Sequence, residues 1–161
     1  MWFDIVNRFT YEHVFSGEAA SLREIVERAV RNGADLSEAN LMRADLAGAN
    51  LCDAKITKAQ LAQADLSAAN LASANMHRAI LTNANLSGAD LSKADLIGAN
   101  LANCNLTGAN LTGAFLTRAD LTGAILEGAE LTRAETLLAR GLRLQDWTSD
   151  NGFKDVSSGS F

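Results

Sequence analysis

Proline is absent from this sequence of 161 residues, and only two cysteines and nine aromatic residues occur in it. Two cysteines are too few for the disulfide framework of a small secreted domain. No stretch of about 18 uninterrupted apolar residues exists, which excludes a membrane-spanning helix. Charged residues near the start interrupt any apolar segment of a secretory signal peptide, and we therefore expect a cytoplasmic protein without membrane contact.

An excess of positive charge is also missing, because 14 lysines and arginines stand against 19 aspartates and glutamates, with a formal net charge of -5. Proteins that bind nucleic acids or anionic membranes need clustered lysine and arginine. We therefore expect no direct nucleic-acid binding. Mimicry of a nucleic acid by acidic side chains stays open.

Alanine and leucine dominate instead, with 29 and 23 copies. From Ala34 to Ala134 alanine returns at every fifth position, and only Cys104 interrupts this series of 21 blocks. Two positions after each alanine, leucine, isoleucine or methionine recurs, with Thr136 as the one polar exception. Aspartate or asparagine stands between the two in most blocks. Such a sequence predicts a core built from small repeated parts.

A period of five residues fits neither an α-helix nor a strand, whose side chains repeat every 3.6 and every two residues. Five residues advance about 500° around an α-helix, which is about 140° past a full turn. The alanines and leucines of successive blocks would then spread around the whole helix and form no buried face. The repeats therefore argue against a helical bundle.

The blocks ADLSE, ANLMR, ADLAG and ANLCD at residues 34–53 resemble the A(D/N)LXX motif of the pentapeptide-repeat family. The resemblance extends over residues 34–138 without a gap. It implies an all-β solenoid, a right-handed quadrilateral β-helix of about five coils with four blocks per coil. The alanine and leucine positions then point inward, and residues twenty apart lie above each other, with about 4.8 Å between coils.

A capping helix is expected before the repeats, because apolar residues follow helical spacing in residues 21–33. Ser21 and Glu24 indicate a capping box at its start, and Gly33 is a candidate for the residue after its end. Apolar and polar residues alternate over residues 9–15, which predicts a short strand or hairpin ahead of the helix. An open solenoid end needs such covers.

The chain therefore divides into an N-terminal strand and capping helix at 1–33, the β-helix at 34–138, and a C-terminal cap or tail at 139–161. Apolar side chains of the last segment serve either as a cover of the final coil or as a contact to a partner. These side chains are Leu142, Leu144, Trp147 and Phe153. Related proteins often dimerise end to end, so the resemblance also implies a homodimer through the C-terminal end.

On this register Cys52 points outward and Cys104 points inward, and eleven blocks separate them. That separation corresponds to about 13 Å along the coil axis. A disulfide spans at most roughly 7 Å between Cα atoms. We therefore predict no intrachain disulfide, with Cys104 as a core residue in the place of alanine.

Two groups of outward residues are candidate binding surfaces. A local basic patch consists of Lys55, Lys58, His77 and Arg78. A candidate protein-contact surface, in which apolar residues replace polar ones, consists of Ile97, Phe115, Leu137 and Leu138, with Ile80 and Ile125 on adjoining sides. Both groups have an alternative interpretation, since acidic neighbours make the first a solvated face, and scattered apolar residues are common on protein surfaces.

A further pair of outward residues, Asp45 and Asp65, is expected about 5 Å apart in neighbouring coils. Like charges at that distance raise the pKa of one carboxyl or attract a cation. Two hydrated carboxylates are the alternative.

The sequence offers no catalytic, cofactor-binding or metal-ligating set. His13 and His77 are the only histidines, and neither stands in a recognisable arrangement with cysteine or aspartate. No phosphate-binding glycine loop and no metal-spaced Cys/His set appears. Glycine recurs in the blocks because corners of the coil need small residues. We expect neither enzymatic activity nor a cofactor.

These observations favour a non-enzymatic module or scaffold that binds another protein of unknown identity. The resemblance supplies an alternative, because some family members mimic duplex DNA and modulate DNA gyrase, which gives quinolone resistance. The repeats hold 11 acidic and 7 basic residues, too small a surplus for a continuous acidic stripe. Those relatives also favour phenylalanine at the central position, where this chain uses leucine. A structural or assembly protein of a phage or prophage is the second alternative.

Overall fold

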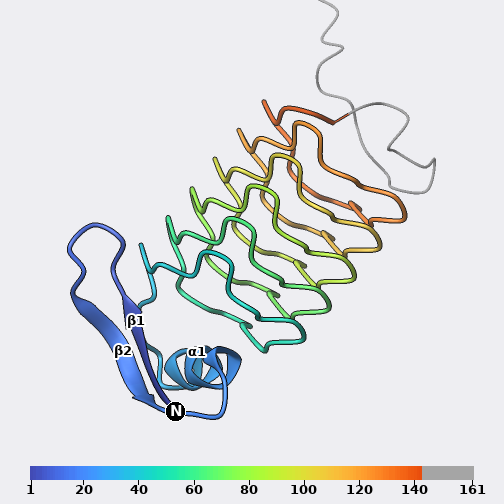
Figure 1. Cartoon of the computed structure of the whole chain (residues 1–161). Helices are drawn as coiled ribbons and strands as arrows, with labels where there is room; N and C mark the ends of the chain where they lie inside the picture. Colours follow the sequence, from blue (N-terminus) through green and yellow to red (C-terminus); the bar gives the residue numbers. More distant parts are fainter. Residues whose placement is uncertain (143–161) are drawn as a thin grey trace, which may run out of the picture.

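Two strands and one helix precede a stack of coils in residues 1–142, the part of the chain that the computed structural model describes. Their bounds are β1 Trp2–Val6, β2 His13–Glu18 and α1 Leu22–Arg31. The hairpin and α1 lie at one end of a rod of coils (Figure 1). Residues 143–161 lie outside the described residues. Most of the expected C-terminal cap falls there, including Leu144, Trp147 and Phe153.

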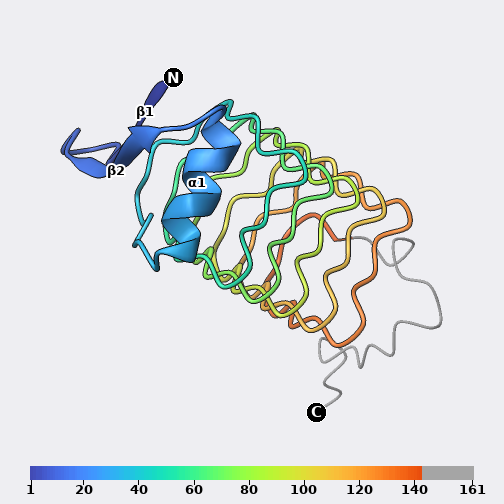
Figure 2. The same ribbon diagram turned by 90° about the horizontal axis from the view of Figure 1, so that it is seen from below.

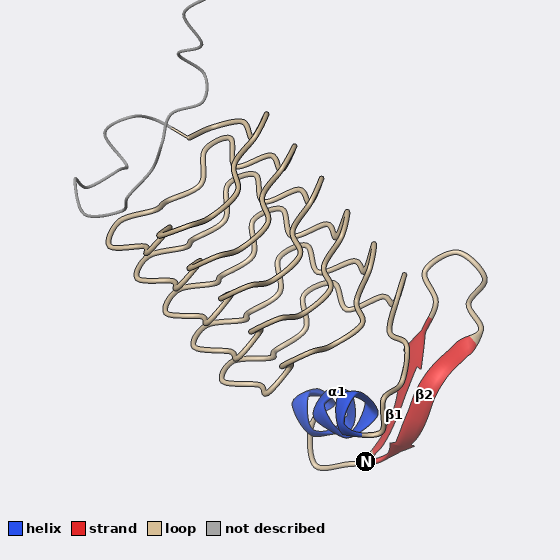
Figure 3. Cartoon of the chain, turned by 180° about the vertical axis from the view of Figure 1, so that it is seen from behind, coloured by secondary structure: helices blue, strands red, loops and turns tan. Residues whose placement is uncertain are grey.

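The coils are joined by parallel bridges between residues that are twenty apart. The series runs from Asp35 paired with Lys55 to Asp120 paired with Arg140, at every fifth residue. Each bridge is one residue long, so the coils are drawn as loops and turns (Figure 3). A twenty-residue repeat of five-residue blocks means four blocks per coil, as the sequence resemblance implied.

The four blocks of a coil define four walls of the rod. The first wall holds the outward residues of the blocks that begin at residues 34, 54, 74, 94, 114 and 134. The second, third and fourth walls hold those of the blocks that follow in order, beginning at residues 39, 44 and 49 in the first coil. The first and third walls are therefore opposite each other, and so are the second and fourth.

The core consists of the first and third residues of the blocks. The third residue of each block, from Leu36 to Leu131, is at most 7% exposed, and no polar or charged residue of the described part is buried with them. Burial of one leucine contributes about 1.5–3 kcal/mol to stability. Cys104 takes the place of an alanine and donates its thiol to the carbonyl oxygen of Leu81 at 2.9 Å. As predicted, Cys104 and Cys52 form no disulfide.

The aspartate or asparagine at the second position of a block closes a turn. Its side-chain oxygen accepts the backbone N–H of the residue two positions later, as Asp65 does from Ser67 at 3.0 Å and Asn100 from Ala102 at 3.0 Å. This contact recurs through the rod, and it is the Asx-turn for which these two residue types are suited. The turn explains why they dominate the second position.

The fifth position of all 21 blocks has a positive φ, near the left-handed region that L-residues rarely occupy. Glycine recurs there because it adopts this φ without steric cost, and not because corners need small residues as we expected. Valine, isoleucine and threonine never occupy the fifth position, whereas threonine occupies the neighbouring fourth position in seven blocks. The stiff β-branched side chains are therefore confined to positions with ordinary φ.

Helix α1 begins and ends with hydrogen bonds that its sequence predicted. The N-cap Ser21 hydroxyl accepts the N–H of Glu24 at 3.2 Å, while the Glu24 carboxylate accepts the N–H of Ala20 at 2.7 Å. The capping box is thus shifted by one residue at its second contact. At the other end Gly33 has φ +71, and its N–H donates to the Val30 carbonyl at 2.8 Å in a Schellman turn.

A hairpin precedes α1, which is one of the two forms expected there, but its strands do not coincide with the segment at residues 9–15 that suggested it. The antiparallel pair joins Trp2 with Glu18 and Ile5 with Phe15, and residues 7–12 form the loop between the strands. Of the alternating segment, residues 9–12 lie in this loop and residues 13–15 lie in β2, whereas β1 was not expected. The hairpin meets the first coil where the Asn40 N–H donates to the Val6 carbonyl at 2.9 Å.

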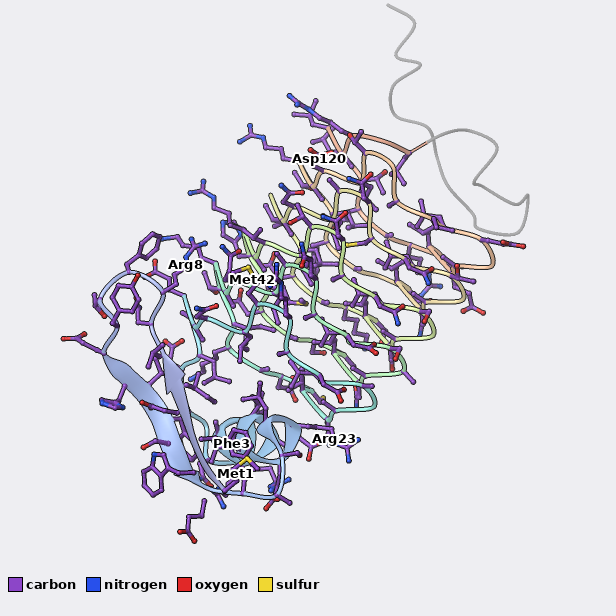
Figure 4. All side chains as sticks on the ribbon, viewed as in Figure 1. Met1, Phe3, Arg8, Arg23, Met42 and Asp120 are labelled. Carbon is purple, nitrogen blue, oxygen red and sulfur yellow. The ribbon has the colours of Figure 1, made fainter. Side chains whose placement is uncertain are left out.

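Helix α1 lies across the N-terminal end of the coil stack and closes it (Figure 2). Its buried residues Ile25, Val26 and Ala29 belong to the same core as the coils. Arg23 donates to the Ala47 carbonyl and Glu27 accepts the Asn50 N–H, each at 2.9 Å. In later coils the equivalent backbone groups form hydrogen bonds with the preceding coil. The side chains of Arg23 and Glu27 therefore replace the hydrogen bonds that a preceding coil would make with the first coil. Figure 4 shows Arg23 beside α1.

No helix among the described residues has the length and apolar character that crossing a membrane requires.

Candidate functional site

The candidate basic patch lies on the first wall, but acidic partners neutralise most of it. Lys58 Nζ lies 3.3 Å from Glu38 Oε1, and His77 Nδ1 lies 3.8 Å from Asp95 Oδ1. Hydrogen bonds from the Ser37 side chain and backbone lower the pKa of Asp35, and the charge of Lys55 adds to that shift. The structure therefore supports the interpretation of a solvated face for this part of the wall.

The apolar candidates are divided among three walls. Phe115, Leu137 and Leu138 are 38%, 59% and 64% exposed on the first wall, where Ile97 is half-buried. Ile80 lies on the second wall and is half-buried between coils. The structure contradicts the expected place of Ile125, because its block lies two positions along the coil, on the opposite wall. Four of the six candidates therefore share the first wall.

The aspartate pair of the third wall is present, since Asp45 and Asp65 form a bridge between neighbouring coils. The expected rise in pKa does not occur at Asp65. Hydrogen bonds from the Ser67 backbone and side chain, with a smaller one from Asn85, lower the pKa of that carboxyl. Among the described residues no cluster of three or more metal-ligating side chains occurs.

The reactive side chains of the described coils are held in unreactive states. Burial raises the pKa of the Cys104 thiol to about 12, and a hydrogen bond to Asp53 raises the pKa of the Cys52 thiol. An activated thiol has the opposite shift. Hydroxyl groups close their own turns, as Thr122 does when it donates to Asp120 at 2.6 Å. That bond is the largest cause of the lowered pKa of Asp120.

Sequence reasoning placed Arg78 in the basic patch but did not group it with three further cations at the margins of the first wall. The four cations stand at fifth positions on its two edges: Arg78 and Arg118 on one, Lys93 and Arg133 on the other. Within residues 1–142 none of them forms an ion pair. The signal was available, because residues twenty or forty apart in the fifth position share an edge of the rod.

Solved structures with the same repeat are similar to this chain. A pentapeptide repeat protein from the thylakoid lumen of Arabidopsis thaliana is 32% identical, over 80% of this chain and 79% of that chain, with a TM-score of 0.55. Rfr23 from the cyanobacterium Cyanothece 51142 is 40% identical, over 52% of this chain and 54% of that chain, with a TM-score of 0.38.

QnrB1, a plasmid-mediated fluoroquinolone resistance protein, is 23% identical over 70% of this chain and 61% of that chain, with a TM-score of 0.37. A likeness with this identity and this TM-score carries no argument about function. No curated protein sequence matches the chain. The sequence profile of the pentapeptide repeats matches in eight copies, over residues 32–57, 59–98 and 99–135, which is more than half of the chain. The chain belongs to the pentapeptide repeat family.

Proposed function

We propose that this chain is a non-enzymatic scaffold whose first wall binds another protein. The observation that carries the proposal is the exposure of Phe115, Leu137 and Leu138 on one wall, whereas the other exposed large apolar residues of the coils, Met42 and Ile125, stand singly on other walls. Exposed apolar residues in a contiguous group are typical of protein contact sites. The proposal includes no cofactor. It also includes the right-handed β-helix that the family resemblance implies.

The unreactive state of the side chains supports a role without catalysis. Neither thiol is activated, and the hydroxyl groups close turns instead of meeting a base. The rigid backbone ladder instead presents a fixed surface, because each coil is bonded to the next at four positions per turn. A cytoplasmic location is part of this proposal.

Site-specific crosslinking tests the proposal. A photoreactive residue in place of Phe115 is expected to capture one partner protein in cells of the native host, whereas the same residue in place of exposed Thr107 captures none. Thr107 is the matched control because it lies on the opposite wall at a similar height. Equal capture at both positions would contradict a specific contact on the first wall.

The gyrase alternative has less support. The second-position row of the third wall begins with Asp45 and Asp65 and continues with Asn85 and Asn105, so it is no continuous acidic stripe. Inhibition of gyrase supercoiling by this protein at equimolar amounts would favour the alternative over the scaffold.

Association at the C-terminal end is a separate proposal, and a phage assembly role would use the same contact. The inward Ala124, Ala129 and Ala139 of the last coils are only half-buried, unlike the alanines below them. An end-to-end homodimer would cover them. Light scattering at micromolar concentration measures the mass, and a monomeric mass would remove this proposal.

A further inference from the structure

We propose that the C-terminal half of the first wall binds an amphipathic α-helix with acidic margins, presented by a partner protein. This half consists of the outward residues of four successive turns, at residues 73–78, 93–98, 113–118 and 133–138. The inference rests on the scaffold function proposed above and gives the chemistry of the partner.

An apolar strip of four residues extends over three successive coils of this surface. Ile97 and Leu137 stand at fourth positions two coils apart, Phe115 stands at the second position of the coil between them, and Leu138 follows Leu137 at a fifth position, on the edge that Arg78 and Arg118 share. Three of these side chains are exposed. The strip therefore offers apolar area along the rod axis, which suits a partner with an apolar stripe.

Cations frame the strip on both sides. Arg78 and Arg118 share one edge of the wall, and Lys93 and Arg133 share the other. Glycine stands between the members of each pair and leaves room for the long side chains to lie along the wall. The Arg78 stem lies 3.4 Å, and the Lys93 stem 3.7 Å, from where a Cβ would stand on Gly98 and Gly113. Long basic side chains in this position cover apolar surface and keep their charges in water.

The local charge has the opposite sign to that of the whole chain. This surface holds four cations but only two carboxylates, those of Asp95 and Glu135, whereas the whole chain has a net charge of -5. The carboxylate of Asp95 also has the His77 imidazole 3.8 Å away. In the N-terminal half of the same wall, Lys58 is paired with Glu38. Unpaired charges beside apolar residues select a partner of complementary sign. The surface therefore favours a carboxylate-rich partner.

The spacing of the cations favours a helix. The members of each pair are two coils apart, which corresponds to about 9.6 Å along the rod. Residues seven apart on an α-helix are about 10.5 Å apart. Alternate residues of a strand are about 6.8 Å apart and do not match. A helix with glutamates seven apart on each side of a leucine stripe thus meets both edges.

The test measures binding of two synthetic peptides to the full chain by fluorescence anisotropy. Both peptides have 18 residues and a leucine stripe, and the stripe is flanked by glutamates in one and by lysines in the other. The acidic peptide is expected to bind at least tenfold more tightly, and its affinity is expected to fall with salt. Equal affinity, tighter binding of the basic peptide, or no binding of either would overturn the proposal.

Charge reversal locates the site. Arg78→Glu together with Arg118→Glu is expected to weaken the acidic peptide at least tenfold, whereas Arg31→Glu together with Arg43→Glu changes the net charge equally and leaves binding within twofold. Glutamate tolerates the fifth position, since Glu38 has φ +61 there, and matching melting temperatures check the fold. Unchanged binding in the first variant would place the peptide elsewhere and overturn the proposal.

Two further outcomes separate this inference from the function on which it rests. If crosslinking at Phe115 captures a partner while the acidic peptide fails to bind, the scaffold function is supported and the proposal of an acidic helix as the partner is overturned. Self-association that sedimentation detects, and that the Arg78→Glu and Arg118→Glu changes abolish, would assign the wall to a second copy and also overturn it.

Discussion

The inward and outward residues of the same blocks follow different rules. The first and third positions vary little because they fill the narrow interior, where alanine and leucine are almost the only residues present. The outward positions vary widely, within two backbone limits: an Asx-turn at the second position and a positive φ at the fifth. The difference teaches that two of every five side chains fill the core, whereas the other three define a surface within those two limits.

The first wall shows how far the outward residues differ on one backbone. In its N-terminal half the polar groups satisfy each other, as Thr57 does when its hydroxyl donates to the side-chain oxygen of Asn75 at 2.9 Å. In its C-terminal half apolar residues replace those contacts, and the cations at the edges have no acidic partner among the described residues. The bridges continue unchanged through both halves. Surface chemistry therefore changes along the rod without a change of fold.

The largest expected effect is a charge placed at an inward position. Leu96 is fully buried, so Leu96→Asp leaves an unpaired carboxylate in the middle of the rod. We expect a loss of about 3–5 kcal/mol in the free energy of unfolding, because nothing compensates the desolvated charge. The change at exposed Thr107, Thr107→Asp, is expected to cost less than about 1 kcal/mol. Urea unfolding followed by circular dichroism measures both.

Equal losses at Leu96 and Thr107 would break the comparison between inward and outward residues. The same result would contradict the assignment of the third residue of each block to the core. A small loss at both sites would mean that the coils open locally without unfolding the rod.

A smaller effect tests the backbone rule of the outward residues. Asn83 has φ +59 at a fifth position, where a β-branched side chain is strained. We expect Asn83→Val to cost about 1–2 kcal/mol, since a left-handed conformation costs that much for such residues. The neighbouring Thr82→Val is the control and is expected to change stability by less than about 0.5 kcal/mol.

Thermal melting of both variants measures the difference. If Val were tolerated equally at positions 82 and 83, the absence of β-branched residues from the fifth position would need an explanation other than φ.

The repeat made most of the fold predictable. Alanine at the first position and leucine at the third gave the inward residues, and the position of Cys104 in that register gave its burial. Helix α1 was predictable because Ser21 and Gly33 mark its ends with local signals. Strand β1 was not, since its residues pair with β2 and with the first coil, and neither contact leaves a periodic pattern in so short a segment.

The candidate site was predictable only in part. Ile97 and Phe115 were placed correctly because the twenty-residue repeat is strict, whereas Ile125 was assigned to the wrong side by a miscount of walls. The paired state of Lys58 and the unpaired state of Arg118 depend on which side chains reach each other across coils. Side-chain reach follows from rotamers and not from the register, so the sequence pattern alone does not determine it.

The smallest expected effect concerns acid stability and sharpens the comparison at the second position. Hydrogen bonds lower the pKa of Asp65 in the folded protein below its value in the unfolded chain, near 3.9. A carboxyl with a lowered folded pKa adds stability above the unfolded pKa, and this contribution is lost as the pH falls through the folded pKa. The described rod is therefore expected to lose stability as the pH falls below about 4.

Asp65→Asn keeps the oxygen that accepts the Ser67 N–H but removes the titration. We expect little change in melting temperature at pH 7 and a smaller fall between pH 4 and pH 2 than in the parent, by less than about 1 kcal/mol because the group is near solvent. Glu130→Gln removes one charge from an exposed carboxylate outside any Asx-turn and is the control. An identical acid dependence in both variants would mean that Asp65 serves its turn as a hydrogen-bond acceptor alone, and that its charge contributes nothing to the rod.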